Sequence, residues 1–280
     1  PWILKRKQLP MPTINVGGLP TYYEIEGPDD APVLTLAHGQ AFDLTVWWAQ
    51  VPYFRDRFRV LCPDLRGHGR TGDGDETELR ISHVAGDIVG LWDAMGVARS
   101  HFVGTSLGGF AGYELALECP ERLSSVTFAA TQAHMPESTV CAIRKRTFGL
   151  KEPGASMVPL VDVLLERYVS DGYKERDPDG FSALGEIVAR GSAMGYALTS
   201  DATLAMNYDP RIGDIRVPTM VIAGALDQST PPDRMQLYQE RISGAQMAVV
   251  PDAGHLPNVE NPEGFNRALA GFLDALEGQT

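Results

Sequence analysis

Cysteine is scarce in this chain of 280 residues, and long apolar runs are absent. The three cysteines, Cys62, Cys119 and Cys141, are odd in number and too widely spaced for a metal site or a disulfide framework. We therefore expect a reducing, cytoplasmic compartment and no bound metal. No apolar run approaches the ~20 residues that cross a bilayer, so no membrane association is expected.

Positive charge is also in short supply. The formal net charge is −12, and the only basic run, Arg144–Arg146, is too short to predict nucleic-acid binding. Long-range charge will not attract such a chain to anionic membranes or nucleic acids. The segment Pro1–Lys7 lacks the apolar core of a signal peptide. We interpret residues 1–12 either as an expression remnant or as a loose N-terminal arm.

The most informative feature that is present is Gly104–Gly108, a G-x-S-x-G pentapeptide centred on Ser106. A short buried strand is expected at 100–103 and a helix at 109–118, and this strand–turn–helix context is typical of a nucleophile elbow. The N-terminus of such a helix favours negative charge that develops beside the serine. The motif therefore predicts a nucleophile at Ser106 instead of an ordinary helix cap.

An acid and a base follow the serine in chain order. Asp227 lies in Val221–Asp227, an apolar strand followed by a loop, and His255 lies after the apolar run Met247–Val250. One helix and one strand fit between them, which is the crossover that brings adjacent parallel-strand ends together. Asp252 is the alternative acid, but it is so close to His255 in the same loop that it is poorly placed to reach the far ring nitrogen.

Backbone donors for an oxyanion are expected in the loop after the first parallel strand. Gly39 allows that loop to turn an amide toward a reacting carbonyl, and we predict an oxyanion hole made by the N–H groups of Gln40 and Leu107. His38 is interpreted as a structural brace of this loop and as a pocket candidate. His134, which follows the strand after the nucleophile helix, is a second residue predicted to line the pocket.

Strand and helix patterns alternate over residues 13–130 and resume over 210–280. Such alternation predicts an α/β fold with a mostly parallel sheet of the eight-stranded type and helices on both faces. The clearest helix is expected over 81–95, where apolar residues fall on one face. Residues 131–209 show no strand pattern, are interrupted by proline and are interpreted as a helical cap inserted over the strand ends. A helix is expected within it over 183–194.

Four motifs carry a resemblance to a known family: Asp64–Gly69, Gly104–Gly109, Asp227–Pro232 and Ala253–Glu260. With these motifs the chain resembles the α/β-hydrolase superfamily over nearly its whole length, and more narrowly the 3-oxoadipate enol-lactonase group of carboxylic ester hydrolases. The resemblance implies that Ser106 is the nucleophile, Asp227 the acid and His255 the base. In the cap, only Gly195–Leu198 with Asp201 is similar to that group, and the Arg-Trp-Phe run expected near its start is absent.

These features predict a serine hydrolase that cleaves a small carboxylic ester or lactone through an acyl-enzyme, with no metal or organic cofactor. Three other activities fit the same residues. They are a carbon–carbon bond hydrolase of a β-diketone or dienoate, a cofactor-free perhydrolase or haloperoxidase, and a small-molecule receptor that keeps a triad. The sequence does not indicate an oligomeric state.

A substrate with a free carboxylate would need a local cation in so acidic a protein, because long-range charge repels it. Arginine suits this role because its planar fork binds both carboxylate oxygens. The candidates are Arg144 and Arg146 near the start of the cap, and Arg190 in the helix expected over 183–194. Each of them alone is also readily interpreted as a solvated helix residue.

Overall fold

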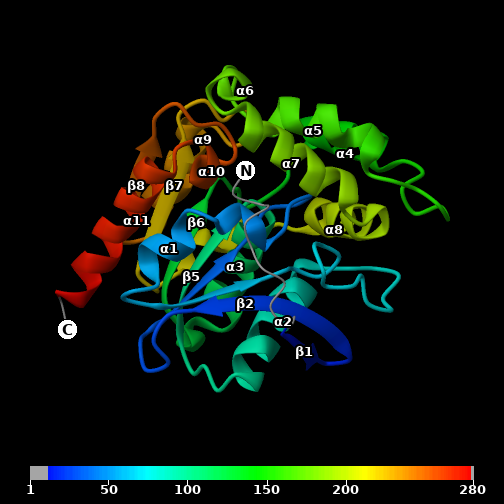
Figure 1. Ribbon diagram of the computed structural model, residues 1–280. Coiled ribbons are helices and arrows are strands. Elements are labelled where there is room, and N and C mark those ends of the chain that lie inside the picture. Colours follow the sequence, from blue (N-terminus) through cyan, green and yellow to red (C-terminus); the bar gives the residue numbers. More distant parts are fainter. Residues whose placement is uncertain (1–11, 279–280) are drawn as a thin grey trace.

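Eight strands form one mixed sheet in the computed structural model, which describes residues 12–278 (Figure 1). The strand order is β1-β2-β4-β3-β5-β6-β7-β8; β2 is antiparallel to both of its neighbours, and all other pairs are parallel. The strands are β1 Thr13–Val16, β2 Leu19–Glu26, β3 Val33–Ala37, β4 Arg59–Pro63, β5 Ser100–Thr105, β6 Leu123–Ala129, β7 Thr219–Gly224 and β8 Gln246–Val250. The prediction of a mostly parallel, eight-stranded α/β fold is confirmed.

Helices cover both faces of this sheet, which explains why its central strands are buried along nearly their whole length. On one face Phe102 and Phe128 pack in a cluster with α2, α3 and α9. On the other face Leu34 and Leu36 pack with α1 and α11. The helices are α1 Gln50–Phe54, α2 Ile81–Ala94, α3 Leu107–Glu118, α9 Pro232–Arg241, α10 Pro257–Glu260 and α11 Pro262–Glu277. None of the helices within residues 12–278 is long and apolar enough to cross a membrane.

Between β6 and β7 the chain forms five α-helices and no strand, and these helices gather above one end of the sheet (Figure 1). We call them the cap helices: α4 Glu137–Thr147, α5 Val161–Tyr168, α6 Tyr173–Arg176, α7 Pro178–Arg190 and α8 Ala193–Ala205. Leu164 of α5 and Ile187 of α7 belong to the same buried cluster as Leu34 and Phe265. The cap helices therefore share a hydrophobic core with the sheet.

The single helix expected over 183–194 is wrong, because two helices meet in this stretch. α7 ends at Arg190, and α8 starts at Ala193 with Ser192 as its N-cap. The Ser192 hydroxyl accepts a hydrogen bond from the Gly195 N–H at 3.0 Å. Serine at an N-cap satisfies a backbone donor that the helix itself cannot pair, so Ser192 marks the start of a second helix.

α8 contacts the loop after β4 through two glycines. A Cβ built on Gly195 would lie 2.1 Å from the carbonyl oxygen of Gly67, and Gly67 itself has a φ of +74°. Glycine is required at such a contact because any side chain would push the two backbones apart. The loop that carries the Asp64–Gly69 motif is in this way fixed against the cap helices.

Replacement of Gly195 by alanine is expected to lower the free energy of unfolding by roughly 1–3 kcal/mol, as overpacking in a rigid contact does. Gly86→Ala is the matched control, because Gly86 also lies in a helix but has no atom within 4 Å of its virtual Cβ. The control is expected to stabilise the protein by about 0.5–1 kcal/mol. Urea-induced unfolding measures both values, and equal effects would show that the glycine contact is unimportant.

Candidate active site

Ser106 stands in a strained turn between β5 and α3. Its φ of 50° and ψ of −108° are unusual for a residue that is not glycine, and its side chain makes no capping hydrogen bond to α3. The turn is tight, because a Cβ on Gly104 would lie 2.2 Å from the Gly108 carbonyl oxygen, and a Cβ on Gly108 would lie 2.3 Å from that of Ala37. Strain of this kind is characteristic of a nucleophile elbow, which leaves the serine hydroxyl free at the end of the sheet.

His255 and Asp227 are joined by a hydrogen bond of 2.7 Å between Nδ1 and Oδ2. They follow β8 and β7, which are neighbours in the sheet. The same Asp227 oxygen accepts a hydrogen bond from the Thr230 hydroxyl at 2.5 Å, and Oδ1 accepts one from the Ser229 N–H at 2.7 Å. The Asp227 carboxylate is thus fixed in a position that orients the His255 ring.

Asp227 is 3% exposed. Burial by itself would raise the pKa of its carboxyl group, but the charge and hydrogen bond of His255 and the hydrogen bonds of Thr230 outweigh burial and lower it to about 2. The Asp252 side chain, by contrast, is exposed. The hydrogen bond that Asp252 accepts from Arg176, at 2.8 Å, goes to its backbone carbonyl oxygen. The geometry favours Asp227 over Asp252 as the partner of His255.

Ser106 and His255 lie at the carboxyl ends of strands in the same half of the sheet. Among the described residues no hydrogen bond joins the Ser106 hydroxyl to the His255 ring. Catalytic hydrogen bonds are often long without substrate and shorten in the complex. The lack of a hydrogen bond between Ser106 and His255 in the described chain is therefore compatible with a shared site.

The loop after β3 lies against Ser106, because a Cβ on Gly39 would be 3.4 Å from the Ser106 Cβ. Neither the Gln40 N–H nor the Leu107 N–H has a backbone partner within the part of the chain that the structure describes. The Gln40 side chain is buried and faces α8, where its Nε2 donates to the Ser200 hydroxyl at 2.8 Å and to the Tyr196 carbonyl oxygen at 3.1 Å. The Gln40 amide nitrogen is therefore engaged by α8, whereas its backbone N–H has no backbone partner among the described residues.

His38 braces this loop and does not line a pocket. It is fully buried; its Nε2 accepts a hydrogen bond from the Leu65 N–H at 2.9 Å, so Nδ1 carries the proton and donates to the Gly39 carbonyl oxygen at 2.8 Å. Burial, with a smaller effect from nearby His68, lowers the pKa of His38 to about 3. The ring is neutral and structural, so its assignment as a pocket candidate is wrong.

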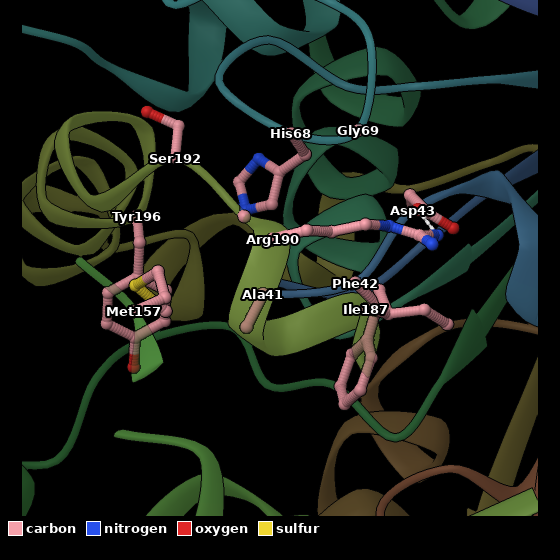
Figure 2. Close-up of a pocket in the computed structure, with 11 residues that line it drawn as sticks. Ala41, Phe42, Asp43, His68, Gly69, Met157, Ile187, Arg190, Ser192 and Tyr196 are labelled. Carbon is pink, nitrogen blue, oxygen red and sulfur yellow. Dashed lines mark hydrogen bonds and ion pairs between the residues drawn. The ribbon is translucent and has the colours of Figure 1, made fainter. Parts of the chain in front are cut away.

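A small cavity of about 10 Å³ lies beside the loop after β3, with Arg190 and His68 in its lining (Figure 2). A cavity of this size holds about one water molecule and no substrate. Arg190 reaches from α7 to Asp43 and forms an ion pair of 2.6 Å with it (Figure 2). The charge of Arg190 is thereby compensated, which argues against the predicted role in binding a substrate carboxylate.

Two more pocket candidates, His134 and Arg144, line neither this small cavity nor the larger one beside α4 and α5. His134 forms an isolated β-bridge with Asn207 at the base of the cap helices, and its Nδ1 is buried without a partner among residues 12–278. Arg144 is exposed on α4. The proposed pocket roles of His134 and Arg144 therefore gain no support from their positions.

Arg146 is the remaining candidate. It is partly buried and lines a larger cavity of about 990 Å³ between α4, α5 and the loop after β7. Its Nε donates to the Tyr196 hydroxyl at 2.7 Å, and its guanidinium has no ion pair with a carboxylate in the described chain. Of the three predicted arginines, only this one combines a cavity position with an uncompensated charge.

Three residues that contact the site were not identified in the sequence. The Tyr168 ring of α5 stacks on His255, with centroids 5.0 Å apart and planes 20° apart. Thr230 bonds Asp227 as described above, and buried Glu260 accepts hydrogen bonds from the N–H groups of Gly254 at 2.9 Å and Ser170 at 2.8 Å. Thr230 and Glu260 lie in two of the motifs, which marks them as candidates; nothing in the sequence marks Tyr168.

All three cysteines are free thiols. Within residues 12–278 no group of three or more histidine, cysteine, aspartate or glutamate side chains is arranged to hold a metal ion.

Comparison with known proteins gives matches over most of the chain. A model of the alpha/beta hydrolase family matches residues 36–268. The chain is 31% identical over 261 residues to 3-oxoadipate enol-lactonase 2 of Acinetobacter baylyi, covering 93% of this chain and 96% of that protein. It is 29% identical over 271 residues to a putative carbamate hydrolase RutD of Stutzerimonas stutzeri, covering 92% and 98% of the two chains. The crystal structure of the enol-lactonase from Burkholderia xenovorans LB400 superposes with a TM-score of 0.88 at 30% identity, covering 94% of this chain and 100% of that one.

Proposed function

Since this chain belongs to the alpha/beta hydrolase family, we propose that it is a serine hydrolase that cleaves a carboxylic ester or a lactone through an acyl-enzyme. The hydrogen bond of 2.7 Å between buried Asp227 and His255 carries the proposal, because it orients a base at the same end of the sheet as the elbow serine. The relatives named enol-lactonase support the choice of ester or lactone chemistry.

In the proposed mechanism His255 removes the proton of the Ser106 hydroxyl as its oxygen attacks the substrate carbonyl. Asp227 holds the imidazole tautomer and stabilises the imidazolium that forms. The N–H groups of Gln40 and Leu107 donate to the oxyanion. When the tetrahedral intermediate collapses, the bond to the leaving oxygen breaks and that oxygen takes the proton from His255. A water molecule, deprotonated by His255, then releases the acid and restores Ser106.

A hydrolysis screen tests this proposal against the alternatives. We expect release of an alcohol or opening of a ring with short acyl esters or lactones, together with labelling of Ser106 by a fluorophosphonate. Turnover only of a β-diketone with release of a ketone, or only of a carbamate, would replace the ester assignment. Bromination that depends on peroxide and halide would indicate a haloperoxidase, and saturable binding without turnover would indicate a receptor.

Arg146 is proposed to bind a carboxylate of the substrate. Arg146→Ala is expected to raise KM for an acidic ester roughly 10-fold or more, because hydrogen bonds to charged groups contribute about 1.5–3 kcal/mol. A neutral ester of equal size should show little change, and Arg144→Ala is the control because Arg144 is exposed and lies outside both cavities. An equal rise for both esters, or a wild-type preference for the neutral one, would contradict a carboxylate-binding role.

Two broader assignments stay predictions. One is the division into a core of residues 13–130 and 210–280 and a cap of residues 131–209, and the other is a cytoplasmic location. The first is supported by the position of the cap helices between β6 and β7. The second depends on the three free cysteines.

A further inference from the structure

The cavity of about 990 Å³ is a groove on the cap helices with an apolar wall. The apolar residues that line it are Ala142, Phe148, Leu150, Ala155, Pro159, Leu160 and Val163. Phe148 is 90% exposed and Val163 49% exposed, so both present apolar surface to water. Apolar side chains that gather in a groove in this way are typical of a surface that a ligand covers.

One end of this groove is built from residues that are bonded to the candidate active site. Gln228 and Ser229 line it and follow Asp227 directly, and the Ser229 N–H donates to the Asp227 carboxylate at 2.7 Å. Arg146 lines it as well and bonds the hydroxyl of Tyr196, whose carbonyl oxygen holds the Gln40 side chain. Lining residues of the groove therefore contact Asp227 directly and reach the Gln40 side chain through one intermediate, Tyr196.

The charge that lines the groove has the opposite sign to the charge of the whole protein. Lys145, Arg146 and Arg167 line it together with one acid, Glu166, although the chain carries a net charge of −12. None of the three cations forms an ion pair with a carboxylate among residues 12–278. Lys145 is exposed, whereas Arg146 and Arg167 are partly buried.

We propose that this groove binds the aliphatic chain of an extended, amphiphilic substrate, a medium-chain acyl ester or a lactone with an alkyl side chain that also carries negative charge. The inference rests on the proposed function, because it requires the reacting carbonyl to lie at Ser106. A short lactone would leave most of a groove of about 990 Å³ filled with water, whereas an alkyl chain would cover Phe148 and Val163.

The test compares p-nitrophenyl acetate, hexanoate and octanoate as substrates. Each methylene that enters the groove should raise kcat/KM by up to about fourfold, which corresponds to ~0.8 kcal/mol per buried methylene. Val163→Trp, which fills the groove from α5, should lower kcat/KM for the octanoate about 10-fold and leave the acetate unchanged, as one or two lost methylene contacts would. Leu237→Trp is the matched control, because Leu237 is 60% exposed on α9 and lies outside the groove.

Three outcomes would overturn the proposal: a wild-type preference for the acetate, an equal loss on acetate and octanoate in Val163→Trp, or the same loss in Leu237→Trp. A protein that hydrolyses none of these esters and opens no lactone in the screen would contradict the proposed function but would not decide the role of the groove. Calorimetric titration with octanoate itself then decides that role. Binding to the wild type that Val163→Trp weakens about 10-fold, as loss of one or two buried methylenes would, supports an alkyl site, and absence of binding overturns it.

Discussion

Replacement of Ser106 by alanine is expected to lower kcat by roughly 10⁴- to 10⁶-fold, as losses of a triad nucleophile do. In the proposed mechanism this hydroxyl forms the bond to the substrate acyl group, and the neighbouring Thr105 hydroxyl is buried and cannot replace it. The measurement is steady-state hydrolysis of the best ester from the screen, with active-site titration to exclude wild-type contamination.

The Ser106→Ala protein should remain folded. The serine side chain makes no capping hydrogen bond and is not fully buried, so its removal leaves no cavity in the core. Thermal unfolding within a few degrees of the wild type checks this expectation. A variant that keeps a tenth of the wild-type activity with an unchanged unfolding temperature would rule out the acyl-enzyme at Ser106.

Asp227→Asn is expected to reduce kcat by about 10⁴-fold, because an asparagine amide in this position stabilises the wrong tautomer of the histidine. Asp252→Asn is the matched control in the neighbouring loop. Asp252 is exposed and has a φ of +55°, a conformation that asparagine adopts well, so this variant should fold and retain activity. A larger loss of kcat in Asp252→Asn than in Asp227→Asn would assign the role of the acid to Asp252.

The same substitution has a consequence for stability at low pH. The pKa of Asp227 in the folded protein is about 2, below the value of about 3.8 for an unperturbed aspartate. The ionised carboxylate therefore stabilises the fold above about pH 4, and this contribution is lost as the pH falls toward 2. Asp227→Asn should remove this part of the pH dependence, which acid unfolding followed by circular dichroism measures.

The sequence predicted the sheet and the elbow correctly because each depends on local signals. The apolar runs of buried parallel strands and the glycines around Ser106 are requirements of the backbone itself. The resemblance to the α/β-hydrolase superfamily is likewise confirmed by a family model that matches residues 36–268. The choice of Asp227 over Asp252 followed from chain topology, and the hydrogen bond to His255 agrees with it.

The lining of the pocket could not be predicted in this way, because it depends on contacts between distant segments. Arg190 and Asp43 are 147 positions apart and form an ion pair, and no local pattern indicates that pairing. Tyr168 reaches His255 only because α5 packs over the end of the sheet. The break between α7 and α8 does have a local signal, because Ser192 is the N-cap of α8. The residues on either side nevertheless resemble one continuous helix, so the break was not predicted.

The attachment of the Gln40 side chain to α8 constrains how this enzyme can change its specificity. Tyr196, Thr199 and Ser200 hold that side chain. If Gln40 donates to the oxyanion as proposed, a new α8 would alter the rate of every reaction together with the choice of substrate. α4, α5 and the segment 148–160 between them carry most of the groove, and no hydrogen bond links the Gln40 side chain to them. Natural divergence and laboratory selection should therefore both find new substrates through α4, α5 and the segment between them, while α8 remains nearly invariant.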